Sequence, residues 1–135
     1  MAQQPDHVRV MRSKLGRARG LGAAKAGTHH WWVERMTAAA LVPLSLWFVI
    51  AVLGMLGANQ PQVAAWIGHP INAALLLALI LLTFHHGQLG MQVVYEDYIP
   101  GAGARTALVL ATKGAALLLA LVAALSVAKI FVAAH

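Results

Sequence analysis

The sequence predicts an all-α integral membrane protein with three transmembrane helices and a basic N-terminal arm. Of its 135 residues, 60% are hydrophobic and only 10% are charged, which is more apolar content than a soluble domain of this size needs. The few charges leave three uninterrupted apolar runs long enough to cross a bilayer. Six of the ten Lys and Arg residues lie between Arg9 and Lys25, a distribution typical of the cytoplasmic flank of a first transmembrane helix.

The basic arm is assigned to residues 1–26 and the membrane anchor to residues 27–135. Although the formal net charge is +6, the positive charge is concentrated in one terminal segment and not on a folded face, so we expect no nucleic-acid partner. The chain contains no cysteine, which excludes iron–sulfur ligation and thiolate zinc sites within it. Any redox centre held by this chain must use other ligands.

The first span is predicted at about residues 36–57, which carry no charge and cover the roughly 30 Å hydrocarbon core at about 1.5 Å per residue. Pro43 lies inside this run, and a bend is expected there. Residues 58–70 contain a cluster of breakers and polar groups, typical of a short loop at the opposite surface, where Trp66 fits the interfacial belt.

The second span is predicted at about residues 71–95 and the third at about residues 106–134. Between them, Glu96 and Asp97 with the turn formers that follow indicate a return to water. Lys113 and Lys129 lie toward the ends of the third span, where long side chains snorkel to the surface. Three crossings that begin at the basic arm place the N-terminus in the cytoplasm and the C-terminus outside.

His86 is the most informative residue of the spans. It lies about 16 Å of helix from Asp97 and therefore near the middle of the bilayer. A titratable group at this depth is a functional candidate as a haem ligand, a proton relay or an ion site, and the alternative is a neutral histidine hydrogen-bonded between helices. Gly90, one turn later, lets a flat macrocycle approach the same face. His85 points about 100 degrees away and is expected to pack elsewhere.

A six-coordinate haem on His86 needs a second axial ligand at the same depth, and this chain offers none. The haem is therefore expected to bridge two subunits. At the cytoplasmic surface, Arg35 is a candidate for contact with haem propionates or a quinone. Asp97 and Tyr98 close the second span on that side, either as a helix end with a belt tyrosine or as hydrogen-bonding groups for a quinone carbonyl.

Two segments resemble the small membrane-anchor subunit of proteobacterial succinate dehydrogenase, respiratory complex II. The second-helix segment HHGQLGMQVVYEDY matches by the spacing from His86 to Asp97 and Tyr98. The first-helix segment HHWWVERMTAAALVPLSLW matches by Arg35 followed by Thr37 and Ala38. The resemblance covers about residues 27–134, and it implies the bacterial inner membrane as the location.

This resemblance implies that His86 is one axial ligand of haem b, with the other supplied by the larger cytochrome b anchor subunit. It implies that Tyr98 hydrogen-bonds ubiquinone, that Asp97 supports that site and that Arg35 lies near the haem propionates. Glu34 departs from the family's pattern, and an acid next to Arg35 is able to pair with it. The chain itself would contribute no succinate-binding residue.

The implied partners are a flavoprotein subunit that oxidises succinate, an iron–sulfur subunit and membrane lipid.

Three alternative functions follow from the same residues. A quinol:fumarate reductase shares this anchor architecture and runs the reaction backwards. A cofactor-free transport or assembly protein would use His85 and His86 as a relay, but the spans hold no further buried acid or base for one. A self-contained diheme cytochrome needs four mid-membrane histidines, and the spans contain two adjacent ones.

Overall fold

The computed structural model describes the backbone of residues 25–135 and the side chains from residue 27 onward. The described chain forms four helices, α2 (Lys25–Gly54), α3 (Gln60–Gly68), α4 (Pro70–Tyr98) and α5 (Ala102–Ala133). No strand occurs within these residues. The predicted basic arm lies outside the described residues except for its last two positions, which begin α2.

Three of the helices are long and apolar enough to cross a membrane, namely residues Gly27–Gly54, Pro70–Tyr98 and Ala102–Ala133. With 28, 29 and 32 residues, each is longer than the roughly 20 residues that a bilayer core requires. The helix ends therefore reach beyond the hydrocarbon on one or both sides. The predicted all-α fold with three membrane-spanning helices is confirmed.

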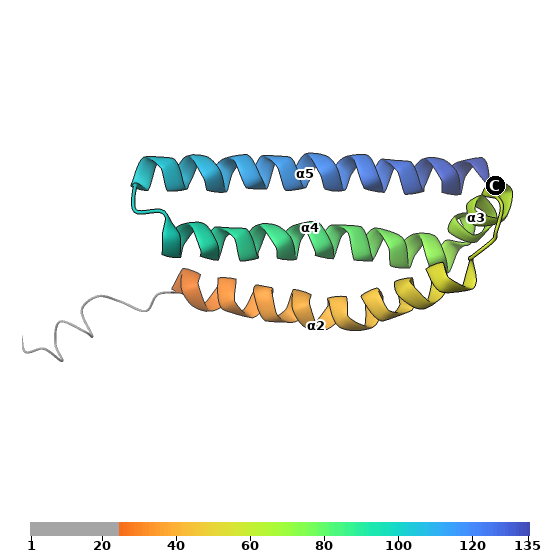
Figure 1. Cartoon of the computed structure of the whole chain (residues 1–135), viewed down its shortest axis with the longest axis horizontal. Helices are drawn as coiled ribbons and strands as arrows, with labels where there is room; N and C mark the ends of the chain where they lie inside the picture. Colours follow the sequence, from red (N-terminus) through yellow and green to blue (C-terminus); the bar gives the residue numbers. More distant parts are fainter. Residues whose placement is uncertain (1–24) are drawn as a thin grey trace, which may run out of the picture.

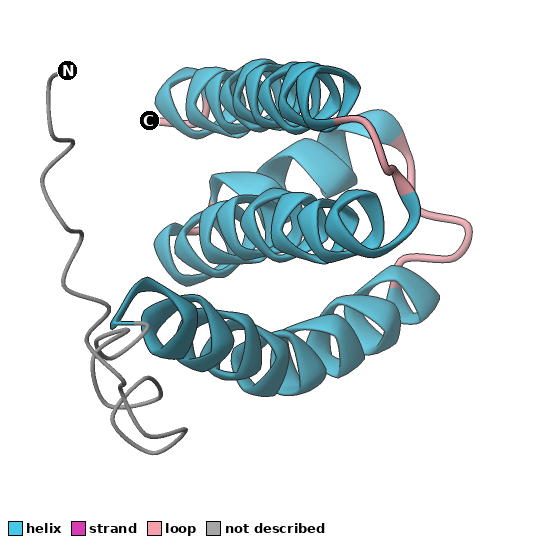
Figure 2. Ribbon diagram, turned by 90° about the vertical axis from the view of Figure 1, so that its left-hand side faces the viewer, coloured by secondary structure: helices cyan, strands magenta, loops and turns pink. Residues whose placement is uncertain are grey.

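The three long helices form a single row with α4 in the centre. Figure 1 shows α2 along one side of α4 and α5 along the other, and Figure 2 shows the same order in a view along the helix axes. Below, an end of the row means the place where the ends of the long helices lie together. α4 packs against both neighbours, whereas α2 and α5 do not pack against each other. The start of α2 and the turn between α4 and α5 lie at one end of the row, and α3 and the C-terminus lie at the other (Figure 1).

At the end where α2 begins, the long helices extend past the spans that hydropathy predicts, whereas at its other end α2 stops at Gly54, short of the predicted residue 57. α2 begins at Lys25 and not near Met36, and α4 continues through Tyr98. Hydropathy marks only the part of a helix that lies in lipid, whereas the backbone hydrogen bonds continue into the interface. Consequently Arg35 and Tyr98 project from helices and not from loops.

α2 is the long helix that is visibly curved in Figure 1, and it contains Pro43. Proline lacks the N–H that would bond the carbonyl four residues earlier, and its ring crowds that carbonyl, so helices bend where it occurs. The curvature agrees with the bend predicted from the sequence.

Residues 58–70 were predicted to form a loop, and this prediction is wrong because most of the segment is α3. Asn59 caps α3 with a reciprocal pair of hydrogen bonds: the Gln62 N–H donates to Asn59 Oδ1 over 3.1 Å, and the Asn59 N–H donates to Gln62 Oε1 over 2.9 Å. Pro61 occupies the first turn, where a missing N–H costs nothing. Breakers at these positions start a helix.

The apolar packing is concentrated at the α3 end of the row. Ala73, Leu76 and Val127 form the buried cluster there. The Trp47 and Trp66 rings stack on each other, with their centroids 5.7 Å apart, and both pack against this cluster. The partly buried residues that pack on this cluster are Trp47, Trp66, Ile67, Leu77, Ile80 and Phe131. The end that contains Arg35 and Tyr98 has no comparable cluster among the described residues.

We expect Asn59→Ala to destabilise the protein, because the Gln62 N–H in the first turn of α3 loses its acceptor, the Asn59 Oδ1. An N-cap truncation of this kind costs about 1 kcal/mol. The measurement is the thermal unfolding midpoint of the protein purified from membranes in detergent, followed by circular dichroism. Asn59→Ser keeps a capping oxygen and should unfold close to wild type, and an equal loss in both variants would argue against the cap.

Candidate functional site

His86 lies on α4 at the interface with α2. Its Nδ1 is 3.0 Å from the Thr37 Oγ1 on α2, which is the one hydrogen bond between side chains of these two helices in the described part of the chain. Thr37 is 7% exposed and is the only buried polar or charged residue among the described ones. The hydrogen bond between helices that the sequence left open as an alternative is therefore present, but it uses one ring nitrogen only.

The second ring nitrogen of His86, Nε2, makes no hydrogen bond within the described residues, where the ring's side-chain contact is through Nδ1. Gly90 is one turn further along α4, on the same face. A Cβ built at Gly90 would meet no atom within 4 Å. Nothing in the described chain therefore requires glycine at this position, although glycine inside a helix costs about 0.5–1 kcal/mol relative to alanine. This face of α4 is open to a neighbour.

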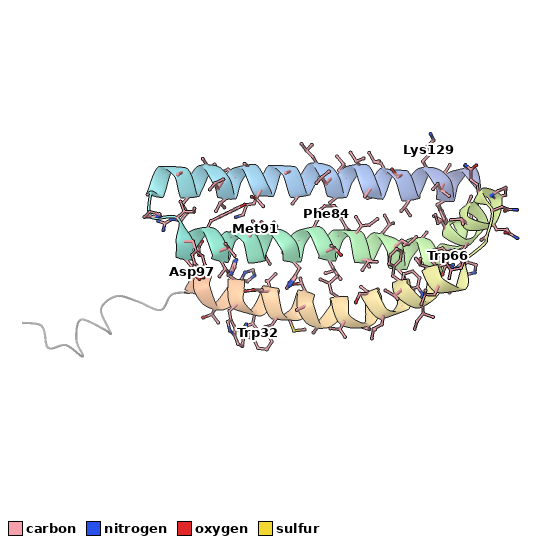
Figure 3. The ribbon with its side chains drawn as sticks, in the orientation of Figure 1. Trp32, Trp66, Phe84, Met91, Asp97 and Lys129 are labelled. Atoms are coloured by element: carbon pink, nitrogen blue, oxygen red, sulfur yellow. The ribbon has the colours of Figure 1, made fainter. Side chains whose placement is uncertain are left out.

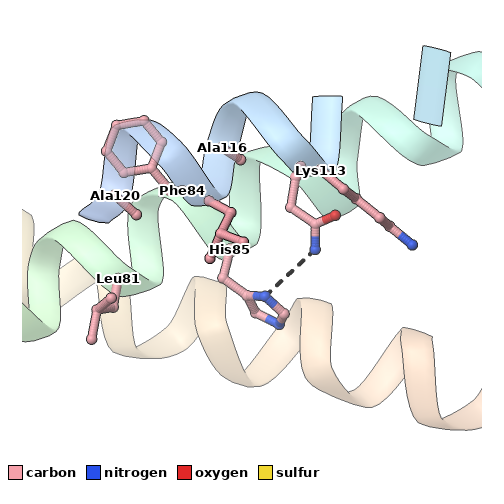
Figure 4. Close-up of a pocket in the computed structure, with 8 residues that line it drawn as sticks. Leu81, Phe84, His85, Lys113, Ala116 and Ala120 are labelled. Carbon is pink, nitrogen blue, oxygen red and sulfur yellow. Dashed lines mark hydrogen bonds between the residues drawn. The ribbon is translucent and has the colours of Figure 1, made fainter. Parts of the chain in front are cut away.

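His85 belongs to a different surface. It is exposed and lines a groove of about 390 Å³ between α4 and α5, together with Phe84, Gln88 and Lys113. The Gln88 Nε2 lies 3.5 Å from the His85 Nδ1, and Figure 4 shows His85 with the other labelled residues that line this groove. Because His86 bonds to α2 and His85 faces α5, the two histidines do not form a relay with each other.

Arg35 is exposed on α2 and lies over an aromatic ring. Its guanidinium carbon is 4.1 Å from the centre of the Trp31 ring, a distance typical of a cation–π contact. Trp31 in turn packs edge-on against Trp32, with centroids 5.5 Å apart. No ion pair forms between Glu34 and Arg35 within the described residues, so the guanidinium keeps its hydrogen-bond donors for other groups.

Asp97 and Tyr98 lie in the last turn of α4. Figure 3 shows Asp97 at the end of the row where α2 begins, the end at which Trp32 also lies, whereas Trp66 and Lys129 are at the opposite end. Tyr98 is 78% exposed, and no hydrogen bond joins it to Asp97 or Arg35 among the described residues. The structure thus brings these three residues to the same end of the row without direct contact between them.

One residue of this region was given no role by the sequence analysis. Thr37 was noted only as a match to a family pattern, and the structure makes it the hydrogen-bond partner of His86. The predicted depths do not suggest this pairing, because Thr37 lies at the start of the predicted first span, whereas His86 is predicted near the middle of the bilayer. The pairing depends on the register between α2 and α4, which one sequence does not specify.

His86 has the hydrogen-bonding arrangement that metal-bound histidines usually show, with one ring nitrogen engaged by Thr37. A neutral imidazole with one nitrogen hydrogen-bonded and the other unengaged is the usual state of a metal-bound histidine. The open face at Gly90 leaves room beside it. The described residues contain no group of three or more His, Cys, Asp or Glu residues that could hold a metal ion.

The fold and the site together define a multi-pass helical membrane subunit with one histidine at an interhelical surface. The pattern of the succinate dehydrogenase/fumarate reductase transmembrane subunit matches residues 9–128. The chain belongs to this family.

Curated relatives agree with this assignment. The succinate dehydrogenase hydrophobic membrane anchor subunit of Rickettsia bellii is 37% identical over 102 residues, which are 76% of this chain and 82% of that protein. The subunit of the same name from Paracoccus denitrificans is 32% identical over 92 residues, 68% of this chain and 71% of that protein. The succinate dehydrogenase membrane anchor subunit of Reclinomonas americana is 30% identical over 84 residues, 60% of this chain and 70% of that protein. No solved structure matches this chain significantly.

Proposed function

We propose that this protein is the small membrane-anchor subunit of a succinate:quinone oxidoreductase. In this role it holds the catalytic subunits at the membrane, supplies His86 as one axial ligand of a haem b shared with a larger anchor subunit, and contributes Tyr98, Asp97 and Arg35 to the site where ubiquinone is reduced. Family membership supports the anchor role, since the relatives carry this name.

The observation that carries the haem assignment is the state of His86. One ring nitrogen is engaged by Thr37, the other makes no hydrogen bond in the described chain, and the adjacent Gly90 face is open. A half-buried imidazole with an unengaged nitrogen is costly in an apolar membrane unless a partner outside this chain binds it. A haem bound there would store and return single electrons. The Arg35 guanidinium lies over the Trp31 ring and makes no ion pair with Glu34 among the described residues, which supports a role in pairing with a haem propionate.

The exposed end of α4 supports a quinone site at the membrane surface. The Tyr98 hydroxyl makes no hydrogen bond within the described residues, so it is available to donate one to a quinone carbonyl. Reduction of the quinone to quinol takes up two protons with two electrons. Asp97 is exposed next to Tyr98 and is able to pass protons from the cytoplasmic water to this site.

The partners follow from what this chain lacks. With no cysteine it offers no iron–sulfur ligand, so a flavoprotein subunit and an iron–sulfur subunit must oxidise succinate and deliver the electrons. The positive charge of the basic arm and of Arg105 supports a cytoplasmic location for the N-terminus and for the turn between α4 and α5. The C-terminus then lies in the periplasm, and the protein lies in the bacterial inner membrane.

A fumarate reductase anchor is the alternative within the same family, because the family pattern covers both. The relatives' names favour succinate oxidation, since each is described as a succinate dehydrogenase subunit.

We expect deletion of this chain in its host to release succinate dehydrogenase activity from the membrane. Activity with a soluble dye as acceptor should move from the membrane to the soluble fraction, and succinate:ubiquinone reductase activity should fall to background. Both activities should return when the wild-type chain is supplied from a plasmid. Membrane-bound, quinone-reducing activity in the deletion strain would contradict the proposed function.

A further inference from the structure

We propose that Thr37 is a positioning residue that holds His86 in the tautomer with a proton on Nδ1, so that the Nε2 lone pair is the one available to iron. This inference rests on the proposed haem role of His86. It assigns to Thr37 a part in the redox chemistry that is separate from helix packing.

The hydrogen-bond pattern around Thr37 determines which atom donates. The Thr37 Oγ1 is 2.8 Å from the Val33 carbonyl oxygen and 2.9 Å from the Glu34 carbonyl oxygen. Carbonyl oxygens only accept, and a hydroxyl has one proton, so this proton lies toward the α2 backbone. The Oγ1 then offers a lone pair to the His86 Nδ1 at 3.0 Å, and Nδ1 must be the donor.

The reverse arrangement is disfavoured. If Thr37 donated to Nδ1, its oxygen would lie within 2.9 Å of two carbonyl oxygens with no proton between them. Thr37 is also the buried polar residue of the described chain, and unsatisfied contacts cost most where water is absent. The observed geometry therefore fixes a single tautomer of His86.

This tautomer has a consequence for a bound metal. When the ring nitrogen that does not bind the metal donates a hydrogen bond, the imidazole is held in one orientation and is a more basic ligand. A more basic ligand stabilises the ferric state more than the ferrous state. Loss of the acceptor oxygen should therefore raise the midpoint potential, by about 59 mV for each tenfold loss of ferric over ferrous preference.

The test uses Thr37→Val, which keeps the shape but removes the hydroxyl, and Thr37→Ser, which restores it. The readouts are the midpoint potential of the b-type absorbance and the low-spin ferric resonance of the purified complex. We expect Thr37→Val to raise the potential, to shift the resonance and to lower haem occupancy. Thr37→Ser should behave as wild type in all three.

A matched control separates this role from simple packing. Thr112→Val deletes a hydroxyl that bonds Tyr95 across the other interface, also at 3.0 Å, and should lower stability without moving the potential. If Thr37→Val does not assemble, Thr37→Ala provides the same comparison with less crowding. An unchanged potential and resonance in an assembled variant without the hydroxyl would overturn the inference.

The two proposals fail in different ways. If His86→Ala keeps the haem, the ligand assignment is wrong and the role of Thr37 falls with it. If His86→Ala loses the haem while Thr37→Val leaves potential and resonance at wild-type values, only the positioning role is wrong.

Discussion

Substitution of His86 by alanine is expected to abolish the b-type haem signal of the purified complex. The variant removes the one imidazole that has an unengaged nitrogen at the open Gly90 face, and a low-spin haem needs both axial ligands. The measurement is the reduced-minus-oxidised absorbance spectrum, with subunit composition checked on the same sample. Loss of the signal in an assembled complex would establish the ligand.

The neighbouring histidine provides the control. His85→Ala removes an equal imidazole one position away, but this side chain faces the groove between α4 and α5. We expect it to leave the haem spectrum unchanged. A full haem signal in His86→Ala, or equal losses in both variants, would be incompatible with a specific role for His86.

Substitution of Tyr98 by phenylalanine is expected to lower kcat/KM for ubiquinone about tenfold, which corresponds to the loss of one hydrogen bond of about 1.4 kcal/mol. The exposed ring remains, so membrane anchoring should persist. Succinate oxidation with a soluble dye, which takes electrons before the quinone site, should keep its wild-type rate. The comparison of the two acceptors in the same membranes gives the measurement.

Tyr95 is the matched control for this experiment. Its hydroxyl lies 3.0 Å from the Thr112 Oγ1 and ties α4 to α5. Tyr95→Phe should therefore lower thermal stability slightly and leave the kinetics with ubiquinone unchanged. If Tyr98→Phe retains wild-type kcat/KM, the tyrosine serves only as an interfacial anchor.

Sequence reasoning predicted the parts of this fold that the bilayer itself dictates. Long apolar runs must become helices in lipid, because every backbone N–H and C=O needs an internal partner there. The three spans were predicted correctly. Helix ends such as Lys25 were not predicted, because they lie in the polar interface, where a charged residue costs little and hydropathy gives no signal for a helix. α3 was also missed, since Asn59 and Pro61 are turn formers in one setting and helix starters in another.

The contact between Thr37 and His86 was beyond the reach of periodicity. Soluble helices reveal their packing face by an apolar stripe, but these helices are apolar on all sides, so the register of α2 against α4 leaves no trace in the pattern. His86 itself was identifiable, because a titratable group within a span is conspicuous by its chemistry. The structure added its partner and its ring orientation.

The single row of helices has a thermodynamic consequence. Many of its large apolar side chains remain exposed, and none of the described side chains is completely enclosed, so little of the free energy that holds this chain in one conformation comes from its own core. Partner subunits that bind only the folded chain raise its free energy of unfolding. This increase grows with the logarithm of the ratio between the partner concentration and its dissociation constant. The melting temperature of this chain is thus a property of the assembly. We expect it to rise when partner subunits are bound in full stoichiometry and to fall when dilution in detergent releases them.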